Sequence, residues 1–120
     1  MDRNMVLFFV LENVELLEPV LLALSRAGIR GATILDSTGA AKTVFAHTET
    51  DPSSALRRFF NPAKSENKTI FTVLPEKMIS AAKEAIESVV GDLSKPFTGI
   101  MFAVEAMYVS GIPDMDDRSD

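Results

Sequence analysis

The feature that most constrains the fold is a strand–helix–strand pattern that occurs twice along the 120 residues. Residues 5–11, MVLFFVL, form an apolar run rich in β-formers, and residues 32–37, ATILDS, form a second run. Between them, Asn13 can cap a helix whose apolar positions recur at helical spacing and which Gly28 ends. Pro19 lies beyond the first turn of a helix that begins at Asn13, so we expect this helix to kink or to start loosely.

The second half of the chain repeats the pattern. Residues 68–74, KTIFTVL, predict a strand, and Pro75 suits the first position of a helix that ends at Gly91. Residues 99–105, GIMFAVE, predict the fourth strand, and residues 107–112 a short extended segment. Two such units with right-handed crossovers predict an α+β, ferredoxin-like split βαβ fold (βαββαβ), with an antiparallel sheet and both helices on one face.

Length and composition indicate one folded domain. A chain of 120 residues with 47% hydrophobic and 24% charged residues can bury a single core. We expect residues 1–112 to form this ferredoxin-like domain and residues 113–120, an acidic C-terminal tail, to be disordered. The tail carries −3 of the formal net charge of −5, so the remainder is nearly neutral. No cluster of basic residues indicates nucleic-acid binding.

No segment of the sequence predicts membrane insertion or catalysis. The apolar run at residues 5–11 is far shorter than the ~20 residues that a membrane-spanning helix needs, and no cleavage site follows it, so we expect a cytoplasmic protein. The chain has no cysteine, which excludes disulfides and thiolate catalysis. Its one histidine, His47, has no evident catalytic partner. We therefore predict that the protein is not an enzyme and has no catalytic residue and no metal site.

Two of the predicted strands are apolar on both sides. Residues 5–11 and 99–105 place apolar side chains on both faces of the sheet, whereas a strand with one face in water normally alternates apolar and polar residues. The two helices cover only one face. We therefore predict that self-association into a homotrimer covers the other; the alternative is that the central connection folds beneath the sheet of a monomer.

A long connection, residues 43–68, joins the two halves. Compact domains usually use links of fewer than ~12 residues, and longer links are commonly functional or disordered. Within it, Asp51 can cap and Pro52 can start a short helix. Arg57 and Arg58 lie away from the apolar positions of that helix and are candidate contacts for a partner protein. A structural plug with solvated arginines is the alternative.

The stretch GIRGATILDSTGAAK, residues 28–42, raises the question of a phosphate site. Its glycines have the spacing neither of a Walker loop nor of a dinucleotide fingerprint. What remains is a strand end whose Thr33, Asp36 and Ser37 side chains can form hydrogen bonds. Gly39 follows, and its lack of a side chain lets backbone amides approach an anion. An ordinary hairpin edge is the alternative.

Together these segments resemble the nitrogen-regulatory P-II-like signalling proteins, in particular short, divergent members of that family. The resemblance rests on GIRGATILDSTG after an amphipathic helix, the long connection, NKTIFTVL, a second helix, GDL and FTGIMFAV, and it covers residues 5–112. It implies a ferredoxin-like fold, a homotrimer with the sheets packed inside, and adenine nucleotides bound in clefts between subunits. It also implies that residues 43–68 dock on a membrane transporter or an enzyme and respond to the ligand.

The strand end and the resemblance together imply a ligand site between the second strand and the start of the fourth, across a subunit boundary. Its predicted members are Thr33, Asp36, Ser37, Gly39, Lys42, Lys95, Thr98 and Gly99. The family's Gly-Asp-Gly-Lys run is replaced by KPFTGIMF, and AMYVSG stands where arginines follow the fourth strand. With so few cations, a monophosphate nucleotide or another small anion suits the site better than a triphosphate does. The sequence is also consistent with a site that binds no ligand at all.

Two other classes of protein stay open. A CutA-like protein is a trimer of the same fold linked to divalent cations, but the shortage of His and Cys argues against it. A small ferredoxin-like or dimeric α+β-barrel enzyme would need a buried acid with a shifted pKa, for which the sequence offers no candidate. The leading hypothesis is a P-II-like regulator that senses a small ligand, with an adenine nucleotide as the candidate, and acts on a partner through residues 43–68.

Overall fold

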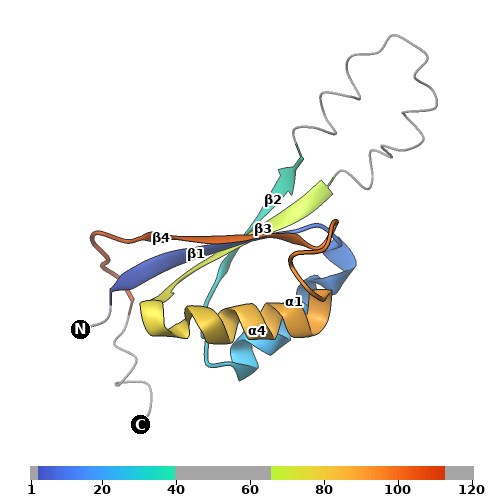
Figure 1. Cartoon of the computed structure of the whole chain (residues 1–120). Coiled ribbons are helices and arrows are strands. Elements are labelled where there is room, and N and C mark those ends of the chain that lie inside the picture. Colours follow the sequence, from blue (N-terminus) through green and yellow to red (C-terminus); the bar gives the residue numbers. More distant parts are fainter. Residues whose placement is uncertain (1–2, 40–65, 113–120) are drawn as a thin grey trace, which may run out of the picture.

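The computed structural model describes residues 3–39 and 66–112, whose arrangement is shown in Figure 1. In chain order the elements are β1 (Asn4–Leu11), the 3-10 helix η1 (Val14–Leu16), α1 (Leu17–Arg26), β2 (Thr33–Thr38), β3 (Glu66–Pro75), the 3-10 helix η3 (Glu76–Met78), α4 (Ile79–Val90) and β4 (Gly99–Glu105). Lys42, Arg57, Arg58 and the tail at residues 113–120 lie outside the described residues, so the expected division into a domain and a tail stays a prediction.

The four strands form one antiparallel sheet in the order β2-β3-β1-β4. Each half of the chain is a strand–helix–strand unit, and the first strands of the two halves, β1 and β3, lie side by side in the middle of the sheet. The two helices, α1 and α4, pack against each other on one face (Figure 1). The predicted ferredoxin-like split βαβ fold is confirmed.

The hydrophobic core lies between the sheet and the two helices. Every second residue at the end of β1, namely Leu7, Phe9 and Leu11, is at most 2% exposed. The other strands and helices complete the core with Ile70, Leu74, Val20, Leu24, Ala82 and Ile86. Because side chains alternate between the two faces of a strand, a slip of one residue would expose this whole set. The core therefore fixes the register of the sheet.

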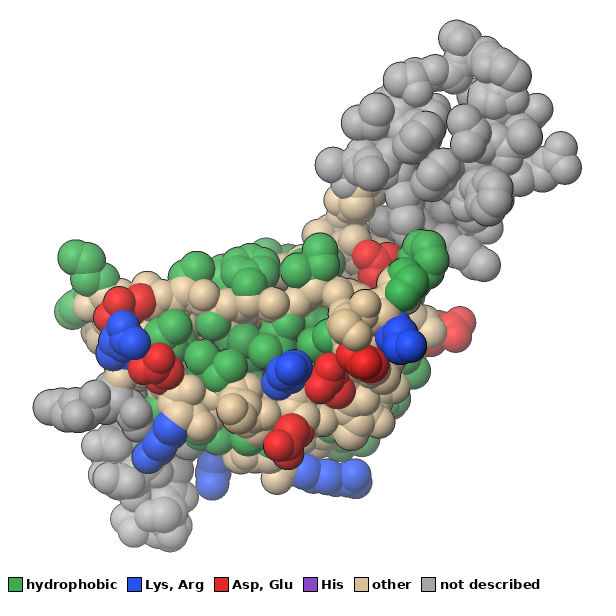
Figure 2. Space-filling model, in the orientation of Figure 1, with side chains coloured by type: hydrophobic (Ala, Val, Ile, Leu, Met, Phe, Trp, Pro, Cys, Tyr) green, Lys and Arg blue, Asp and Glu red, His purple; other side chains and the backbone are tan. Residues whose placement is uncertain are grey.

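The opposite face of the sheet is also apolar, and no helix of the described part covers it. The register places nine apolar side chains on this open face: Val6, Phe8, Val10, Leu35, Phe71, Val73, Ile100, Phe102 and Val104. Ile100 is 61% exposed and Phe102 47%. Phe8 stacks on Phe102 with ring centroids 4.9 Å apart. Figure 2 views the sheet nearly edge-on and shows hydrophobic side chains along its margin away from the helices.

The start of the first helix differs from the prediction. Asn13 caps only the short 3-10 helix η1, by accepting a hydrogen bond from the Glu15 N–H, and α1 begins after it. The loose start is therefore confirmed as a 3-10 turn. Pro19, however, lies within the first turn of α1 and not beyond it. It costs no intrahelical hydrogen bond there, because the first N–H groups of a helix have no partner within the helix.

β3 is longer than predicted at both ends. It begins at Glu66, so residues 66–68 belong to the sheet and the predicted connection, 43–68, extends too far. Glu66 pairs with the last residue of β2, and this pairing is what extends the strand. At the other end, Pro75 closes β3 in an extended conformation instead of opening a helix. The Glu76 N–H that follows it donates to the Arg3 carbonyl and starts η3.

Candidate functional site

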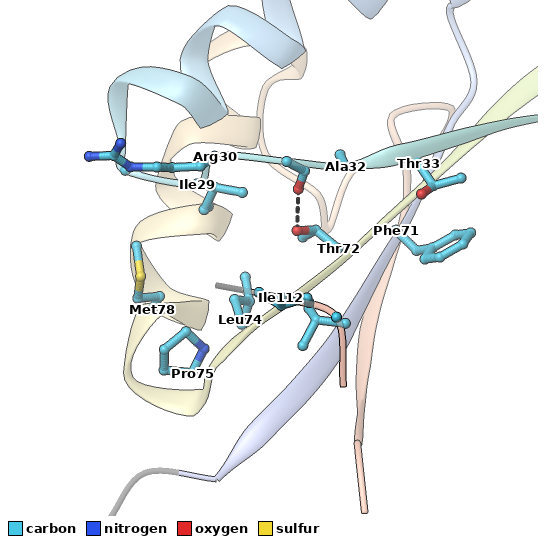
Figure 3. Close-up of a pocket in the computed structure, with 14 residues that line it drawn as sticks. Ile29, Arg30, Ala32, Thr33, Phe71, Thr72, Leu74, Pro75, Met78 and Ile112 are labelled. Atoms are coloured by element: carbon cyan, nitrogen blue, oxygen red, sulfur yellow. Dashed lines mark hydrogen bonds between the residues drawn. The ribbon is translucent and has the colours of Figure 1, made fainter. Parts of the chain in front are cut away.

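A pocket of about 270 Å³ opens beside the start of β2 (Figure 3). It lies between the loop from Gly28 to Ala32, the end of β3, and a segment near the C-terminal end of the described residues. Its walls are mostly apolar, with Ile29, Ala32, Phe71, Val73, Leu74, Pro75, Met78 and Ile112. Ligand pockets usually start at about 300 Å³. The pocket of one chain therefore suits one group of a ligand rather than a whole nucleotide.

The loop that forms one wall of the pocket is shaped by the end of α1. Gly28 has a φ of 97°, which residues with a side chain rarely adopt. Its N–H donates to the Ser25 carbonyl, and the Ile29 N–H donates to the Leu24 carbonyl, which is the pattern of a Schellman motif. Ile29 and Leu24 are both part of the buried core. The loop therefore leaves the helix at a fixed angle toward β2.

Thr72 of β3 ties this loop to the sheet. Its hydroxyl donates a 2.5 Å hydrogen bond to the Gly31 carbonyl, and the residue is only 6% exposed. In Figure 3 this bond is the dashed line that joins Thr72 to the loop beside Ala32. We did not predict Thr72 as a site residue. The signal that marks it is a threonine on the buried side of the run TIFTVL, where the alternation calls for an apolar residue.

Few polar side chains face the pocket. Thr33, a predicted ligand contact, lines it from the first residue of β2 and is exposed. In Figure 3 the Arg30 guanidinium extends away from Thr72 and Ile112, so its charge lies on the outer side of the loop. None of the described residues that line the pocket is acidic. The interior of the pocket therefore suits an uncharged group.

The other predicted residues of β2 bind to β3 instead of facing the pocket. The Lys68 ammonium donates a 2.5 Å hydrogen bond to the Asp36 carboxylate across the two strands. The Ser37 hydroxyl donates to the Asn67 side-chain oxygen at 2.5 Å and lies 2.8 Å from the Thr69 hydroxyl. Asp36 and Ser37 therefore stabilise the end of the β2–β3 pair, from which the long connection leaves.

The predicted residues Lys95 and Thr98 lie in the turn between α4 and β4. The Thr98 hydroxyl donates to the Lys95 carbonyl at 3.0 Å. Earlier in the turn, the Asp92 carboxylate accepts hydrogen bonds from the backbone N–H and the hydroxyl of Ser94. These bonds, the backbone one foremost, hold the pKa of Asp92 below its ordinary value. The turn is thus ordered by its own polar groups.

The two predicted glycines differ in what the fold requires of them. Gly99 has a φ of 135°, and a Cβ there would collide with the Val10 carbonyl oxygen and the ring of Phe9. At Gly39 a Cβ would meet only the Asn67 side chain, at 3.9 Å. Gly99 is therefore required by the packing of β4 on β1. A ligand role for either glycine stays a prediction.

The two groups of predicted site residues lie at opposite edges of the sheet. Along one row, Asp36 pairs with Lys68, Lys68 with Leu11, and Leu11 with Gly99. Two strands, β3 and β1, thus lie between β2 and β4. Three spacings between neighbouring strands place these two edge strands about 14 Å apart. One chain does not bring these groups into one site. Their meeting across a subunit boundary stays a prediction.

No group of three or more His, Cys, Asp or Glu side chains in residues 3–39 and 66–112 is placed to hold a metal ion. Within the same ranges, none of the helices is long and apolar enough to cross a membrane. His47 lies outside them.

Solved structures with a similar arrangement come from PII and PII-like proteins. CPII, a nitrogen regulatory PII-like protein from Thiomonas intermedia K12, was solved bound to ADP, AMP and bicarbonate. It is 20% identical, with a TM-score of 0.53, over 86% of each chain. Arabidopsis thaliana PII bound to citrate is 14% identical, with a TM-score of 0.59, over 88% of this chain and 78% of that one.

The fold is that of the PII-like proteins. The resemblance seen in the sequence is thereby confirmed at the level of the fold. No protein-family model matches the sequence, and no curated protein matches it. In this PII-like fold, the pocket lies at the start of β2, and the long connection leaves from the end of the same strand.

Proposed function

We propose that the chain is a PII-like regulator that binds a small ligand, an adenine nucleotide or another small anion, in a cleft between subunits. The observation that carries the proposal is the apolar pocket at Thr33 in a fold shared with CPII, which was solved with ADP and AMP bound. CPII is named as a nitrogen regulatory protein. The proposal accordingly involves no enzymatic step.

The assembly that we infer is a homotrimer with the open sheet faces inside. A stable monomer rarely leaves a contiguous apolar surface of this kind in water, and the nine side chains of the open face include three phenylalanines. In a ring of identical subunits each contact joins two different surfaces. The β2 edge of one subunit can then lie beside the β4 edge of the next. That contact would complete a cleft from Thr33 on one side and Lys95 and Thr98 on the other.

Charge limits which ligands this cleft suits. Of the described cations, Lys68 is paired with Asp36 and Arg3 with Glu76. Among the described cations, Arg30 lies in the loop beside the pocket, and Lys95 lies in the turn between α4 and β4. A triphosphate needs several cations or amide donors around it. We therefore place AMP and other small anions ahead of ATP.

The output of the regulator, in this proposal, passes through residues 43–65 to a membrane transporter or a metabolic enzyme. β2 leads from the pocket to this connection, so a ligand with different affinities for two positions of β2 would shift the base of the connection. Arg57 and Arg58 stay candidate contacts for an acidic partner surface. A cytoplasmic location belongs to the same proposal.

Isothermal titration calorimetry with AMP, ADP, ATP, bicarbonate and citrate tests the ligand. We expect AMP or a small anion to bind more tightly than ATP. Thr33→Val should weaken binding about tenfold without a change in melting temperature, because Thr33 is exposed and its hydroxyl is not needed by the core. Thr38→Val, at the other end of β2 and also exposed, is the control and should bind normally. Failure of all five compounds to bind would contradict the proposal.

Hydrogen exchange tests the output. Protection in residues 43–65 should change when a compound that binds is added, whereas β1 and β3, which carry core residues, should exchange as before. Identical exchange of residues 43–65 with and without bound ligand would mean that the connection takes no part in signalling.

A further inference from the structure

We propose that Thr72 determines which ring the pocket accepts: a heterocycle that presents an amino group to Thr72 is preferred to one that presents a carbonyl oxygen at the same place. This inference rests on the proposed function, since it takes the uncharged group in the pocket to be the base of a nucleotide. The inference adds a specificity-determining residue to that function. It follows from the hydrogen bond that the Thr72 hydroxyl already donates to the Gly31 carbonyl.

A hydroxyl group has one proton to donate and two lone pairs that accept. The Thr72 hydroxyl gives its proton to the Gly31 carbonyl, at 2.5 Å. Toward any third group, the oxygen can then only accept a hydrogen bond. A ligand must therefore bring an N–H or O–H donor to pair with Thr72.

The bond from Thr72 to Gly31 resists exchange for a bond to a ligand. Thr72 is 6% exposed, so little water is at hand to replace either partner. The Gly31 carbonyl belongs to the loop that the end of α1 fixes through Gly28. If the hydroxyl turned its proton to a ligand, this carbonyl would lose its partner in mostly apolar surroundings. The branched Cβ of threonine restricts χ1, which keeps the hydroxyl oxygen itself beside the Gly31 carbonyl.

The side chains around Thr72 offer no substitute donor for a ligand carbonyl. The neighbouring side chains that line the pocket are apolar, among them Ile29, Leu74 and Ile112. The Arg30 guanidinium, which could donate, extends away from Thr72 (Figure 3). A ligand carbonyl oxygen placed against Thr72 would lose its hydrogen bonds to water and face the lone pairs of the Thr72 hydroxyl oxygen. Binding in that position would therefore be unfavourable. Thr33 does not discriminate, because an exposed hydroxyl can turn to donate or to accept.

Paired nucleotides test this inference. AMP and IMP, and likewise ADP and IDP, differ along one edge of the purine. The first of each pair carries an amino group at C6, and the second carries a carbonyl oxygen at C6 and a hydrogen on the neighbouring N1. We expect the wild-type protein to bind AMP and ADP about tenfold or more tightly than IMP and IDP in calorimetric titrations. Thr72→Val removes the hydroxyl and should bring this ratio close to one. Thr72→Ser keeps the hydroxyl and should keep the preference.

Thr69→Val is the matched control. It removes a hydroxyl from the same strand, but on the open face and outside the pocket, so the AMP-to-IMP ratio should stay as in the wild type. Because the readout is a ratio of two affinities, a general loss of stability in a variant affects both and does not imitate the expected result. Circular dichroism and melting temperatures establish that each variant is folded.

Each outcome decides between the two proposals. Equal affinity of the wild type for the amino and carbonyl nucleotides would overturn the role of Thr72 and leave the proposed function standing. A folded Thr72→Val variant that keeps the preference would do the same. Binding of none of the four nucleotides would overturn a nucleotide ligand and the role of Thr72 together. Should Thr72→Val fail to fold, the wild-type ratio still decides the inference, and loss of the preference in Thr72→Ser would overturn it.

Discussion

Gly99, at the scale of single residues, shows how little space some positions of this fold allow. Its φ of 135° already disfavours a side chain, and a Cβ would overlap the Val10 carbonyl oxygen and the Phe9 ring. Phe9 is 1% exposed and belongs to the buried core, so its ring cannot move away without disturbing other core residues. Glycine at this position is therefore needed for β4 to pair with β1, whatever contact it makes with a ligand.

We expect Gly99→Ala to lower the free energy of unfolding by about 2 kcal/mol or more, because the backbone conformation and the overlap both oppose a Cβ. Gly31→Ala is the matched control. Nothing lies within 4 Å of a Cβ there, and the φ of Gly31 is not positive. The control should change stability by less than about 1 kcal/mol. Urea unfolding measures the free energy of unfolding of the two variants. Equal values for Gly99→Ala and Gly31→Ala would show that β4 can shift to accept a side chain.

At the scale of elements, several polar bonds hold the turn between α4 and β4. Gly91 ends α4, and the Glu87 carboxylate then accepts a hydrogen bond from the Leu93 N–H at 2.9 Å. Asp92 accepts from Ser94 at 2.9 Å and 2.8 Å. Two carboxylates thus order the segment that leads to Lys95 and Thr98. The order of this turn should depend on the charge of the Asp92 carboxylate.

The stability that Asp92 contributes should depend on pH. Its pKa is lowered in the folded chain, chiefly by the Ser94 N–H, and returns to the ordinary value near 3.8 when the chain unfolds. The contribution is therefore complete well above 3.8 and is lost as the pH falls through the lower, folded-state pKa. Asp92→Asn keeps an acceptor but has no charge. It should be less stable than the wild type at neutral pH, and the difference should shrink at about pH 3. Guanidinium unfolding at several pH values measures this, and a difference that stays constant would contradict it.

The sequence predicted the strands and helices well because the core itself requires their periodicity. The apolar runs at residues 5–11, 68–74 and 99–105 all fall within observed strands. The errors lie where a boundary depends on a partner. Whether Pro19 costs a hydrogen bond depends on where α1 begins, and Pro75 ends a strand because β3 continues its pairing with β1 up to that residue. Neither effect can be derived from local propensity.

The candidate site could be predicted only in part, for a similar reason. Thr33, a predicted ligand contact, lines the pocket, because a strand that follows a glycine-rich loop places its first residue there; its contact with a ligand stays a prediction. Thr72 lies 41 residues from Gly31 in the sequence, and their hydrogen bond exists only once β2 and β3 are paired. Ser37 was predicted as a ligand contact, but the same pairing gives its hydroxyl a partner on β3. Long-range contacts thus decide which polar groups are available to a ligand.

At the scale of the whole molecule, the two faces of the sheet differ in what covers them. One face packs on α1 and α4 and holds the buried core. The other carries exposed apolar side chains, with Val104 46%, Phe102 47% and Ile100 61% exposed. These three lie along the edge strand β4, so a neighbouring subunit that covered them would also contact the edge that carries the α4–β4 turn.

Phe102→Asp should convert the inferred trimer into a folded monomer. Phe102 is half exposed in one chain, so a carboxylate there is tolerated in water but not in an apolar contact between subunits. Leu22→Asp is the matched control, because Leu22 is 51% exposed on α1, on the helix side of the molecule, and its variant should keep the wild-type mass. Light scattering after size-exclusion chromatography measures this. A wild-type protein that is monomeric at micromolar concentration would contradict the assembly.

The pairing of β2 gives the molecule a mechanical property. β1 supports β3 only as far as the pair Leu11–Lys68, whereas Ser37 and Thr38 continue to pair with β3 beyond it. The end of β2 is therefore part of a two-stranded ribbon that projects past the rest of the sheet (Figure 1), and such ribbons are more strongly twisted than wider sheets. From Thr33 to Thr38 the strand spans about 17 Å. Over that length, a tilt of about 5° at the pocket end would displace the far end by about 1.5 Å, so even a small rotation of β2 would be felt where the chain enters residues 40–65.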